Sequence, residues 1–350
     1  MRRSRSPLPA PGSRLAWSRL RAMKAIVIEA PGDENCMRIG DLPPPELEAG
    51  AIRIRNFAAG VNRADLLQRQ GYYPPPLGAP ATLGLECAGE IAEVASGVDR
   101  FAVGDRVMAL LPGGGYAEDV VVDAGSAILL PDALSFEEGA GLTETLLTVF
   151  LNVFQLGGLG EGGSVLVHGG GSGIGTTTID LVKRAGGTVV ATAGSREKCE
   201  RCLELGADAV ANYREDDWVA LAREATGGHG VNVVLDSIGG PYLAGNLDVL
   251  TDEGTLVLIG LMGGAKAEIS LGALLTRRLR VLGSTLRTRS AEQKAAIVRA
   301  FLERFGAALA AGEIRPVLHE VFPLEEASEA HRMLKASTHF GKVVLRIDRD

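Results

Sequence analysis

A glycine-rich turn between an apolar run and a helix-compatible segment carries the most specific chemistry in this sequence. Residues 169–175 read Gly-Gly-Gly-Ser-Gly-Ile-Gly and follow Ser164–His168, a run long enough for one buried strand. Residues 176–185 are compatible with a helix, and the β-branched run 188–192 predicts a second strand. Strand, turn, helix and strand within about thirty residues is the setting in which helix N–H groups bind a dinucleotide pyrophosphate.

The turn departs from the strict G-x-G-x-x-G pattern at one position. We expect Gly170 to allow the tight turn and Gly175 to let the helix pack closely against the sheet. Ser172 stands where a second glycine would let the backbone approach the pyrophosphate, and its small side chain has a hydroxyl that can donate to a phosphate. The predicted cofactor-binding residues of the turn are Gly170, Ser172, Gly173, Ile174 and Gly175.

The residues after the second strand bear on which nucleotide is bound. An enzyme built for NAD usually places Asp or Glu there to hold the ribose 2′-hydroxyl. This chain instead reads Ala-Gly-Ser-Arg-Glu-Lys over residues 193–198, so Ser195, Arg196 and Lys198 are available to a 2′-phosphate. The pattern favours NADP (NADPH); ordinary charges at a solvated helix start are the alternative interpretation.

Other reactive side chains form no recognisable constellation. The four cysteines have no spacing typical of a disulfide framework or a complete zinc site. We interpret Cys199-x-x-Cys202 as ordinary helix residues and His168 as a buried histidine at a strand end. The other four histidines have no companions that indicate a metal site or a triad, so no metal ligand is predicted.

Length and charge restrict the classes of protein. A chain of 350 residues is expected to form two domains. Its net charge of −7 argues against a specific nucleic-acid partner, and no apolar run approaches the roughly eighteen residues that would span a bilayer. Residues 1–22 differ, with six Arg and no acid. Three interpretations fit them: a disordered or upstream extension, a mitochondrial-type transit peptide, or a nucleic-acid arm. We expect a cytoplasmic protein, or a mitochondrial matrix protein in the second case.

The order of elements indicates the fold. Residues 23–139 hold short alternating runs punctuated by Gly and Pro, typical of β structure, whereas residues 140–285 alternate strands with helices. A helix over 291–311 and a strand over 342–347 close the chain. Ligands of a parallel sheet bind at the carboxyl ends of its strands, which is where Asp236–Gly240 and Gly260–Gly264 are expected. Asp236 is equally compatible with a helix cap, a packed polar residue and a ligand.

Several segments resemble one family: residues 61–66 (Val-Asn-Arg-Ala-Asp-Leu), 69–76, 84–89, 212–215 and 260–264. They are similar to the zinc-free, zeta-crystallin-like quinone oxidoreductases of the medium-chain dehydrogenase/reductase superfamily, from Met23 to Ile347. The resemblance implies an α/β protein in which a Rossmann doubly wound parallel sheet (140–285) is inserted in a GroES-like mainly-β domain (23–139 plus 286–350). The active site would lie in the cleft between them.

The resemblance also implies a site without zinc. Where zinc-dependent alcohol dehydrogenases have Gly-His-Glu, this chain has Gly84-Leu85-Glu86, and Asn62 replaces their first zinc-binding cysteine. A quinone or an activated enone is electrophilic enough to be reduced without a Lewis acid. The expected activity is therefore an NADPH:quinone oxidoreductase. The alternatives are an NADPH-dependent enone or alkenal double-bond reductase and a non-enzymatic NADPH-binding protein.

Residue by residue, the resemblance implies the following roles. Asn62 and Tyr73 would face the nicotinamide and substrate, with Tyr73 either a proton donor or a wall of the pocket. Thr148 would lie near the nicotinamide, and Lys198 and Tyr213 would contact the 2′-phosphate end, lined by Gly194 and Ser195. Gly260, Leu261, Met262 and Lys342 are further implied cofactor contacts. The stretches 284–289 and 340–342 also resemble cofactor-contacting segments of the family. The family pairs through the edge of the cofactor sheet, so Arg280–Thr285 is the expected edge strand of a homodimer or homotetramer.

Overall fold

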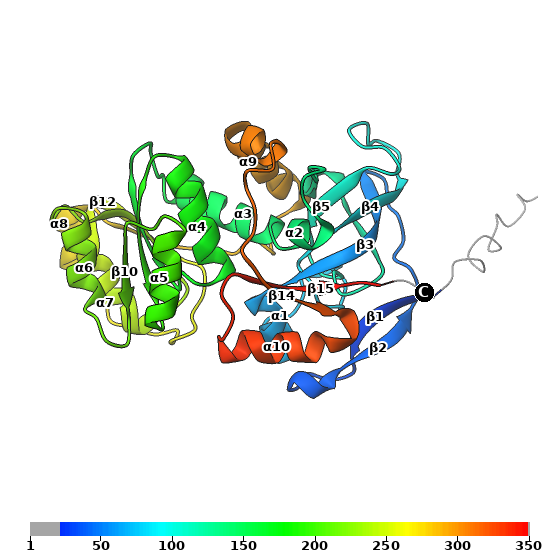
Figure 1. Ribbon diagram of the computed structural model, residues 1–350, viewed down its shortest axis with the longest axis horizontal. Helices are drawn as coiled ribbons and strands as arrows, with labels where there is room; N and C mark the ends of the chain where they lie inside the picture. Colours follow the sequence, from blue (N-terminus) through cyan, green and yellow to red (C-terminus); the bar gives the residue numbers. More distant parts are fainter. Residues whose placement is uncertain (1–21, 349–350) are drawn as a thin grey trace, which may run out of the picture.

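Two β-sheets organise the chain in the computed structural model, which describes residues 22–348. Figure 1 shows a sheet flanked by helices on one side of the molecule and a mainly-β half on the other. The three interpretations of residues 1–22 concern residues that, apart from Ala22, lie outside the described part of the chain. No helix within 22–348 is long and apolar enough to cross a membrane.

The first sheet is parallel and has six strands in the order β10-β9-β8-β11-β12-β13. This is the strand order of a doubly wound dinucleotide-binding fold, with its switch point between β8 and β11. The strands are β8 (Ser164–His168), β9 (Thr188–Ala193), β10 (Ala209–Asn212), β11 (Val231–Asp236), β12 (Leu250–Leu258) and β13 (Arg280–Gly283). The helices between them are α4 (Gly173–Arg184), α5 (Arg196–Glu204), α6 (Trp218–Ala225), α7 (Leu243–Val249, after the 3-10 turn Gly240–Tyr242) and α8 (Leu271–Arg277).

The second sheet is mostly antiparallel and is built from both ends of the chain. Its order is β14-β15-β3-β4-β5-β7, and β6 also pairs with β3. The bounds are β3 (Ala51–Val61), β4 (Glu86–Val94), β5 (Arg106–Leu110), β6 (Asp119–Asp123), β7 (Ala127–Leu129), β14 (Leu318–Pro323) and β15 (Lys342–Arg346). The hairpin β1 (Met23–Ile28) and β2 (Met37–Leu42) stands beside it. This arrangement, in which the C-terminal strands β14 and β15 complete the sheet beside β3, confirms the expected GroES-like fold.

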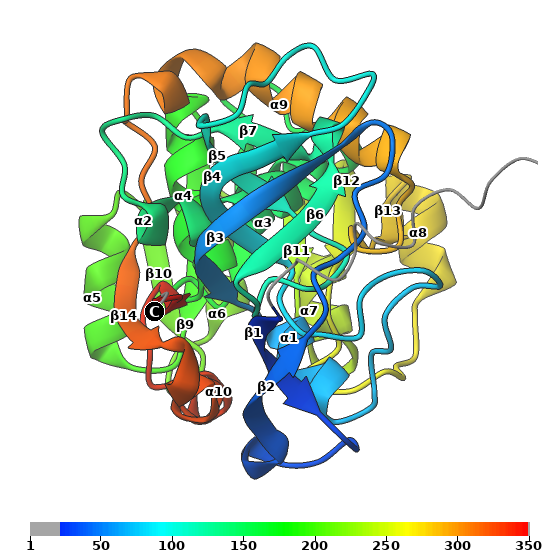
Figure 2. The same cartoon turned by 90° about the vertical axis from the view of Figure 1, so that its right-hand side faces the viewer.

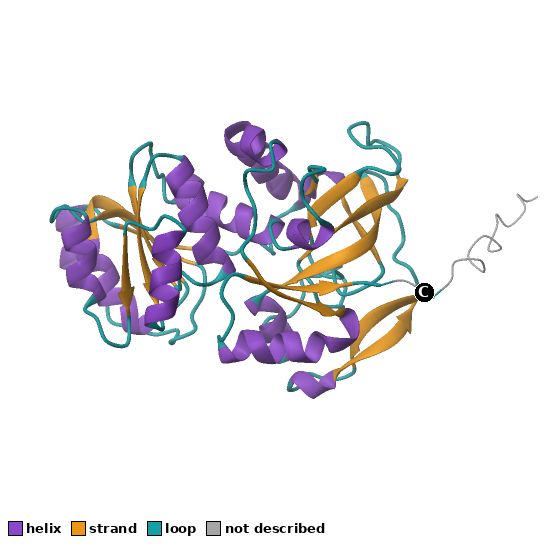
Figure 3. Cartoon of the chain, in the orientation of Figure 1, coloured by secondary structure: helices purple, strands orange, loops and turns teal. Residues whose placement is uncertain are grey.

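Short helices connect and cover this second sheet. They are α1 (Arg63–Arg69), α2 (Phe136–Ala140) and α10 (Ala327–Ala336), with 3-10 turns at Glu34–Cys36, Ala124–Ser126 and Leu324–Glu326. Figure 3, coloured by secondary structure, shows the strands of this sheet in orange with the short helices around them in purple. β4 begins only at Glu86, because Gly84 adopts a φ of +102° that breaks the extended backbone.

One apolar core joins the two halves. α3 (Thr143–Val149) runs directly into a π-helix (Phe150–Leu156), and nearly every residue of this segment is buried. Phe150 makes an edge contact with Phe301 of α9 (Ala291–Ala310). The same cluster includes Met108 of the second sheet and Val165 of the first. The predicted boundary at 139/140 falls inside α2, so the exact division of the domains stays a prediction.

Candidate active site at the seam of the two sheets

The glycine-rich turn joins β8 to α4 as predicted. Gly169 has a φ of +77°, the left-handed region that favours glycine, and the backbone N–H of Gly170 donates to the Thr192 carbonyl at 2.8 Å. The sequence predicted the sharp turn at Gly170, but the structure has it at Gly169. Gly170 must be small for another reason: a Cβ there would lie 2.9 Å from the Cβ of Ala191 on the next strand.

The turn fits a pyrophosphate by its hydrogen-bond chemistry. Ser172 caps α4, since its Oγ accepts the Gly175 N–H at 3.0 Å and its carbonyl accepts the Thr176 N–H. A helix start leaves its first N–H groups without intrahelical partners, so those of Gly173 and Ile174 remain for an anion. The Ser172 hydroxyl proton is also free to donate. A Cβ on Gly175 would lie 2.4 Å from the Gly169 carbonyl oxygen, so glycine is required for this close packing.

The residues predicted for the 2′-phosphate gather where β9 ends. Ser195 caps α5, accepting the Lys198 N–H at 3.3 Å, and a Cβ on Gly194 would lie 2.7 Å from the Tyr213 hydroxyl oxygen. Lys198 Nζ donates to the Ser337 and His339 carbonyls at 2.7 Å each. This lysine therefore ties the cofactor sheet to the segment before β15. Burial is the main cause that lowers the Lys198 pKa, and nearby Arg201 and Arg214 lower it further.

The segment before β15 also crosses the glycine-rich turn itself. The Gly341 N–H donates to the Gly171 carbonyl at 2.8 Å, and the buried Phe340 ring lies beneath the Arg201 guanidinium, 3.9 Å from its carbon to the ring centroid. Gly260, Leu261 and Met262 follow β12 at the carboxyl edge of the sheet, and the Leu261 and Met262 side chains are exposed. The two stretches 260–264 and 340–342 therefore lie at the strand ends where a ligand is expected.

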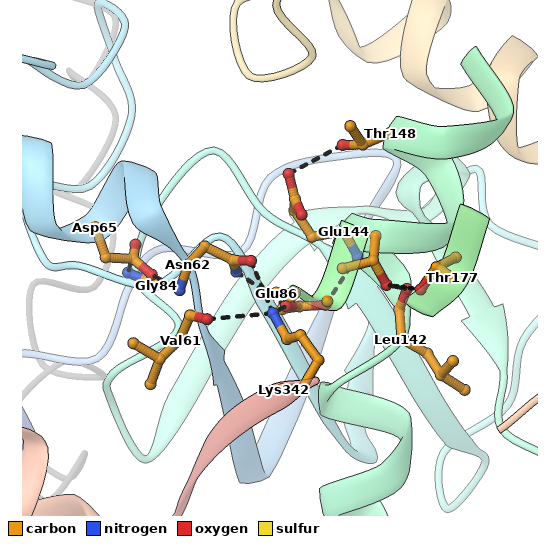
Figure 4. Close-up of polar contacts among 12 residues, drawn as sticks. Val61, Asn62, Asp65, Gly84, Glu86, Leu142, Glu144, Thr148, Thr177 and Lys342 are labelled. Carbon is orange, nitrogen blue, oxygen red and sulfur yellow. Dashed lines mark hydrogen bonds and ion pairs between the residues drawn. The ribbon is translucent and has the colours of Figure 1, made fainter. Parts of the chain in front are cut away.

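A buried ion pair occupies the seam between the sheets (Figure 4). Lys342 Nζ lies 2.6 Å from Glu86 Oε1 and donates to Asn62 Oδ1 at 2.7 Å and to the Val61 carbonyl at 3.2 Å. Asn62 Nδ2 donates to Glu86 Oε1 at 2.9 Å. Both hydrogen-bonding ends of the Asn62 amide are thus engaged. Lys342, predicted as a cofactor residue, lies in this cluster, and its role toward the cofactor stays a prediction.

A second carboxyl continues the cluster along α3. The Glu144 N–H donates to Glu86 Oε2 at 2.8 Å, and Glu144 Oε1 accepts the Thr148 hydroxyl at 2.9 Å. Burial, reinforced by the negative charge of Glu86, raises the pKa of Glu144 to about 7, against the opposing effect of Lys342. Thr148 therefore lies beside the titratable carboxyl of Glu144. Its predicted place near the nicotinamide stays a prediction.

Tyr73 lies close enough to Glu144 for their charges to interact. Burial raises its pKa, the Arg287 guanidinium opposes this, and Glu144 raises the pKa further. The Arg287 guanidinium carbon lies 5.4 Å from the centroid of the Tyr73 ring, and its Nε donates to the Pro112 carbonyl at 2.8 Å. Both predicted substrate-facing residues, Asn62 and Tyr73, therefore border the same cluster.

The residues interpreted as structural are buried. His168 is 2% exposed, with Nε2 2.7 Å from Asn246 Oδ1 and Nδ1 3.1 Å from Thr192 Oγ1, and burial lowers its pKa to about 4. Asn246 in turn donates to Asp236, which also accepts the Ile238 and Gly239 N–H groups. Asp236 is therefore a packed polar residue. Cys199 and Cys202 are free and buried on α5.

Sequence reasoning missed Glu144 as a site residue, included Arg287 only within the stretch 284–289, and took Glu86 only as part of a motif. One signal was present: Glu144 and Thr148 are four residues apart, which places them on one face of a helix. The meeting of Glu86, Glu144 and Lys342 depends on chain segments about 58 and 256 residues apart, so no local pattern predicts it. Among residues 22–348 no group of three or more His, Cys, Asp or Glu could hold a metal ion.

Known proteins share both halves of this chain. Residues 48–132 match the alcohol dehydrogenase GroES-like domain, and residues 205–345 match the zinc-binding dehydrogenase family. The quinone oxidoreductase of Salmonella typhimurium is 33% identical over 322 residues, covering 90% of this chain and 96% of its own. The solved structure of Escherichia coli quinone oxidoreductase complexed with NADPH superposes with a TM-score of 0.81 at 30% identity, covering 92% of this chain and 99% of that one.

The solved structure of CurK enoyl reductase is also similar, with a TM-score of 0.82 at 26% identity over 93% of this chain and 100% of that one. The doubly wound parallel sheet and the matched GroES-like domain show an oxidoreductase of the medium-chain dehydrogenase/reductase superfamily. Within that class, the chain belongs to the quinone oxidoreductase family. The predicted resemblance to quinone oxidoreductases of this superfamily is thus confirmed.

Proposed function

We propose that this enzyme reduces quinones with NADPH and without a bound metal. The similarity to quinone oxidoreductases over nine-tenths of the chain supports the acceptor, and the NADPH complex of one relative supports the cofactor. The proposal that no metal is bound is supported by the Asn62–Glu86–Lys342 cluster. Leu85 has no ligand atom, the Asn62 amide is engaged at both ends, and the cation at this place is the Lys342 ammonium.

The proposed cofactor contacts follow from the geometry of the strand ends. The Gly173 and Ile174 amides and the Ser172 hydroxyl would hold the pyrophosphate, and Ser195, Lys198 and Tyr213 would hold the phosphorylated ribose. The exposed stretch 260–262 and Thr148 would border the nicotinamide, with Asn62 and Tyr73 toward the acceptor. When bound, NADPH supplies the hydride. The protein positions the acceptor and supplies the polar surroundings.

An enone or alkenal reductase remains a second candidate, because the CurK enoyl reductase shares the fold over nearly the whole chain. A parallel acceptor screen separates the two. We expect NADPH oxidation with a 1,4-naphthoquinone at least tenfold more efficient, in kcat/KM, than with a 2-alkenal, and little activity with NADH. Faster turnover of the alkenal would select the second candidate. Binding of NADPH without oxidation by any acceptor would reject both.

We further propose that the enzyme is a homodimer, or a homotetramer built from such dimers, paired through β13. This strand is the outer strand of the parallel sheet, so its free edge can accept a second copy. Leu271 and Leu275 on the adjacent α8 are 70% and 79% exposed, which suits burial against a partner. The predicted edge strand 280–285 is therefore preceded by a helix, α8, that exposes two leucine side chains.

A further inference from the structure

Glu144 has the placement of a positioned acid. Its backbone N–H is bound to Glu86 and its carboxyl to Thr148, so both ends of the residue are held. Its neighbours Thr143 and Thr145 are 0% and 1% exposed, whereas Glu144 keeps partial contact with solvent. Figure 4 shows its carboxyl directed toward Thr148 and away from the Lys342 ammonium. A carboxyl fixed in this way can both reach a ligand beside Thr148 and exchange protons with water.

The proposed reaction needs a proton as well as a hydride. For an enone, the hydride forms a C–H bond at Cβ, the π electrons move to give an enolate, and Cα then takes up a proton. For a quinone, the negative charge left on oxygen takes up the proton. The other polar groups of the seam are poor donors. Lys342 is engaged with three acceptors, and burial raises the pKa of Tyr73 above that of an ordinary phenol.

The charges around Glu144 suit the delivery of a proton near neutral pH. The Glu144 backbone N–H is bound to Glu86, which is paired with Lys342. The negative charge of Asp65 also raises the pKa of Glu144. Tyr73 also interacts electrostatically with Glu144, and the Arg287 guanidinium lies over the Tyr73 ring. The net result is that burial and the negative charge of Glu86 raise the pKa of Glu144 to about 7. General acids work best with a pKa near the operating pH.

We propose that Glu144 is the catalytic acid of this enzyme, delivering its proton to the acceptor, and that Thr148 is a positioning residue that orients its carboxyl. This inference rests on the proposed function. The O–H bond of Glu144 breaks as the new C–H or O–H bond on the acceptor forms. The resulting carboxylate then takes a proton from solvent through its exposed side, so the enzyme returns to its starting state.

The stereochemistry of protonation tests the assignment. A 2-methyl-substituted enone is reduced with NADPH in D2O, and the deuterium at Cα is located by NMR. We expect the wild type to deuterate one face of Cα. Glu144→Gln keeps the shape but cannot act as an acid, so kcat should fall about a hundredfold, within the range of general acid catalysis, and the deuterium should divide between both faces. Glu144→Asp keeps an acid and should retain one face at a lower rate.

NADPH binding, followed by fluorescence titration, gives a readout that does not depend on turnover. Glu144→Gln should bind NADPH within twofold of the wild type, as should Glu161→Gln, the same change in an exposed loop, which should also leave kcat unaltered. An active wild type with an equally fast and equally face-selective Glu144→Gln overturns the assignment. So does a Glu144→Gln variant that loses NADPH affinity at unchanged kcat. A wild type that turns over neither quinone nor enone overturns the proposed function itself.

Discussion

Lys342 Nζ and Glu86 Oε1 lie 2.6 Å apart, although 256 residues separate them in the chain. The side chains are 5% and 0% exposed, so this ion pair is nearly free of water. It joins the C-terminal strand β15 to β4, and through the Glu144 N–H it also fixes the start of α3. The pair therefore holds together the three elements that border the proposed site.

Removing one partner of this pair should be costly. Lys342→Met leaves the Glu86 carboxylate buried without its cation, which typically costs about 3–5 kcal/mol of unfolding free energy. Urea denaturation measures the loss. Lys183→Met is the matched control, because Lys183 pairs with Asp208 at the surface and such pairs contribute about 0–1 kcal/mol. The double variant Glu86→Gln, Lys342→Met should recover part of the loss. A Lys342→Met protein as stable as the control would contradict this account.

Gly175→Ala should disturb the cofactor turn. The added Cβ would lie 2.4 Å from the Gly169 carbonyl oxygen and 2.5 Å from backbone atoms of Gly170, and rigid backbone cannot yield cheaply. Overpacking of this kind costs about 1–3 kcal/mol. We expect a loss of stability in that range and NADPH affinity at least tenfold weaker. Gly160→Ala, where the Cβ would meet nothing within 4 Å, should change neither. Unaltered NADPH affinity in Gly175→Ala would show that the turn does not bind the pyrophosphate.

Lys198→Glu tests the nucleotide preference. One charge-assisted hydrogen bond contributes about 1.5–3 kcal/mol, so NADPH affinity should fall at least tenfold while NADH affinity stays nearly the same. The structure adds a competing explanation, because Lys198 Nζ also ties down the Ser337 and His339 carbonyls. Fluorescence titration with both nucleotides separates the two roles. Equal loss for NADPH and NADH would mean that Lys198 acts only by fixing that segment.

The parts of the fold that sequence predicted well are those set by local pattern. The strand at Ser164–His168 matches its predicted bounds, because it is a short apolar run ended by turn residues. The helix predicted over 291–311 ends one residue earlier, at Ala310. The glycine turn was placed correctly, but the role of Gly170 was not. Three successive glycines offer the same freedom, and only tertiary packing decides which one takes the positive φ.

The site was harder to predict for a related reason. Asn62, Tyr73 and Thr148 came from the resemblance, and the structure brings all three to the seam. What Lys342 touches could not be inferred, since its partners come from β3 and β4 at the far end of the chain. The raised pKa of Glu144 depends on burial and on Glu86, and neither is visible in the residues beside it.

Leu275→Glu should weaken the proposed pairing of subunits. The substitution puts a charge where α8 would be covered by a second copy, and a desolvated, unpaired carboxylate opposes association. Light scattering after gel filtration should show a lower mass than for the wild type at the same concentration. Leu77→Glu, at another exposed leucine in the loop before β4, is the control. A wild type that is already monomeric, or a Leu275→Glu protein of unchanged mass, would argue against pairing through this edge.

Glu144→Gln should make the folded protein more stable at alkaline pH while impairing the reaction. The pKa of Glu144 is about 7 in the folded state and near 4.5 when unfolded, so between these values the folded state binds more protons. The wild type therefore loses stability as pH rises from about 4.5 through 7, by up to about 3 kcal/mol, because a charge is created in a buried position beside Glu86. Glutamine creates no charge. Urea denaturation at pH 8.5 should find the variant more stable, with the difference vanishing below pH 5, whereas a pH-independent difference would place Glu144 outside this electrostatic cluster.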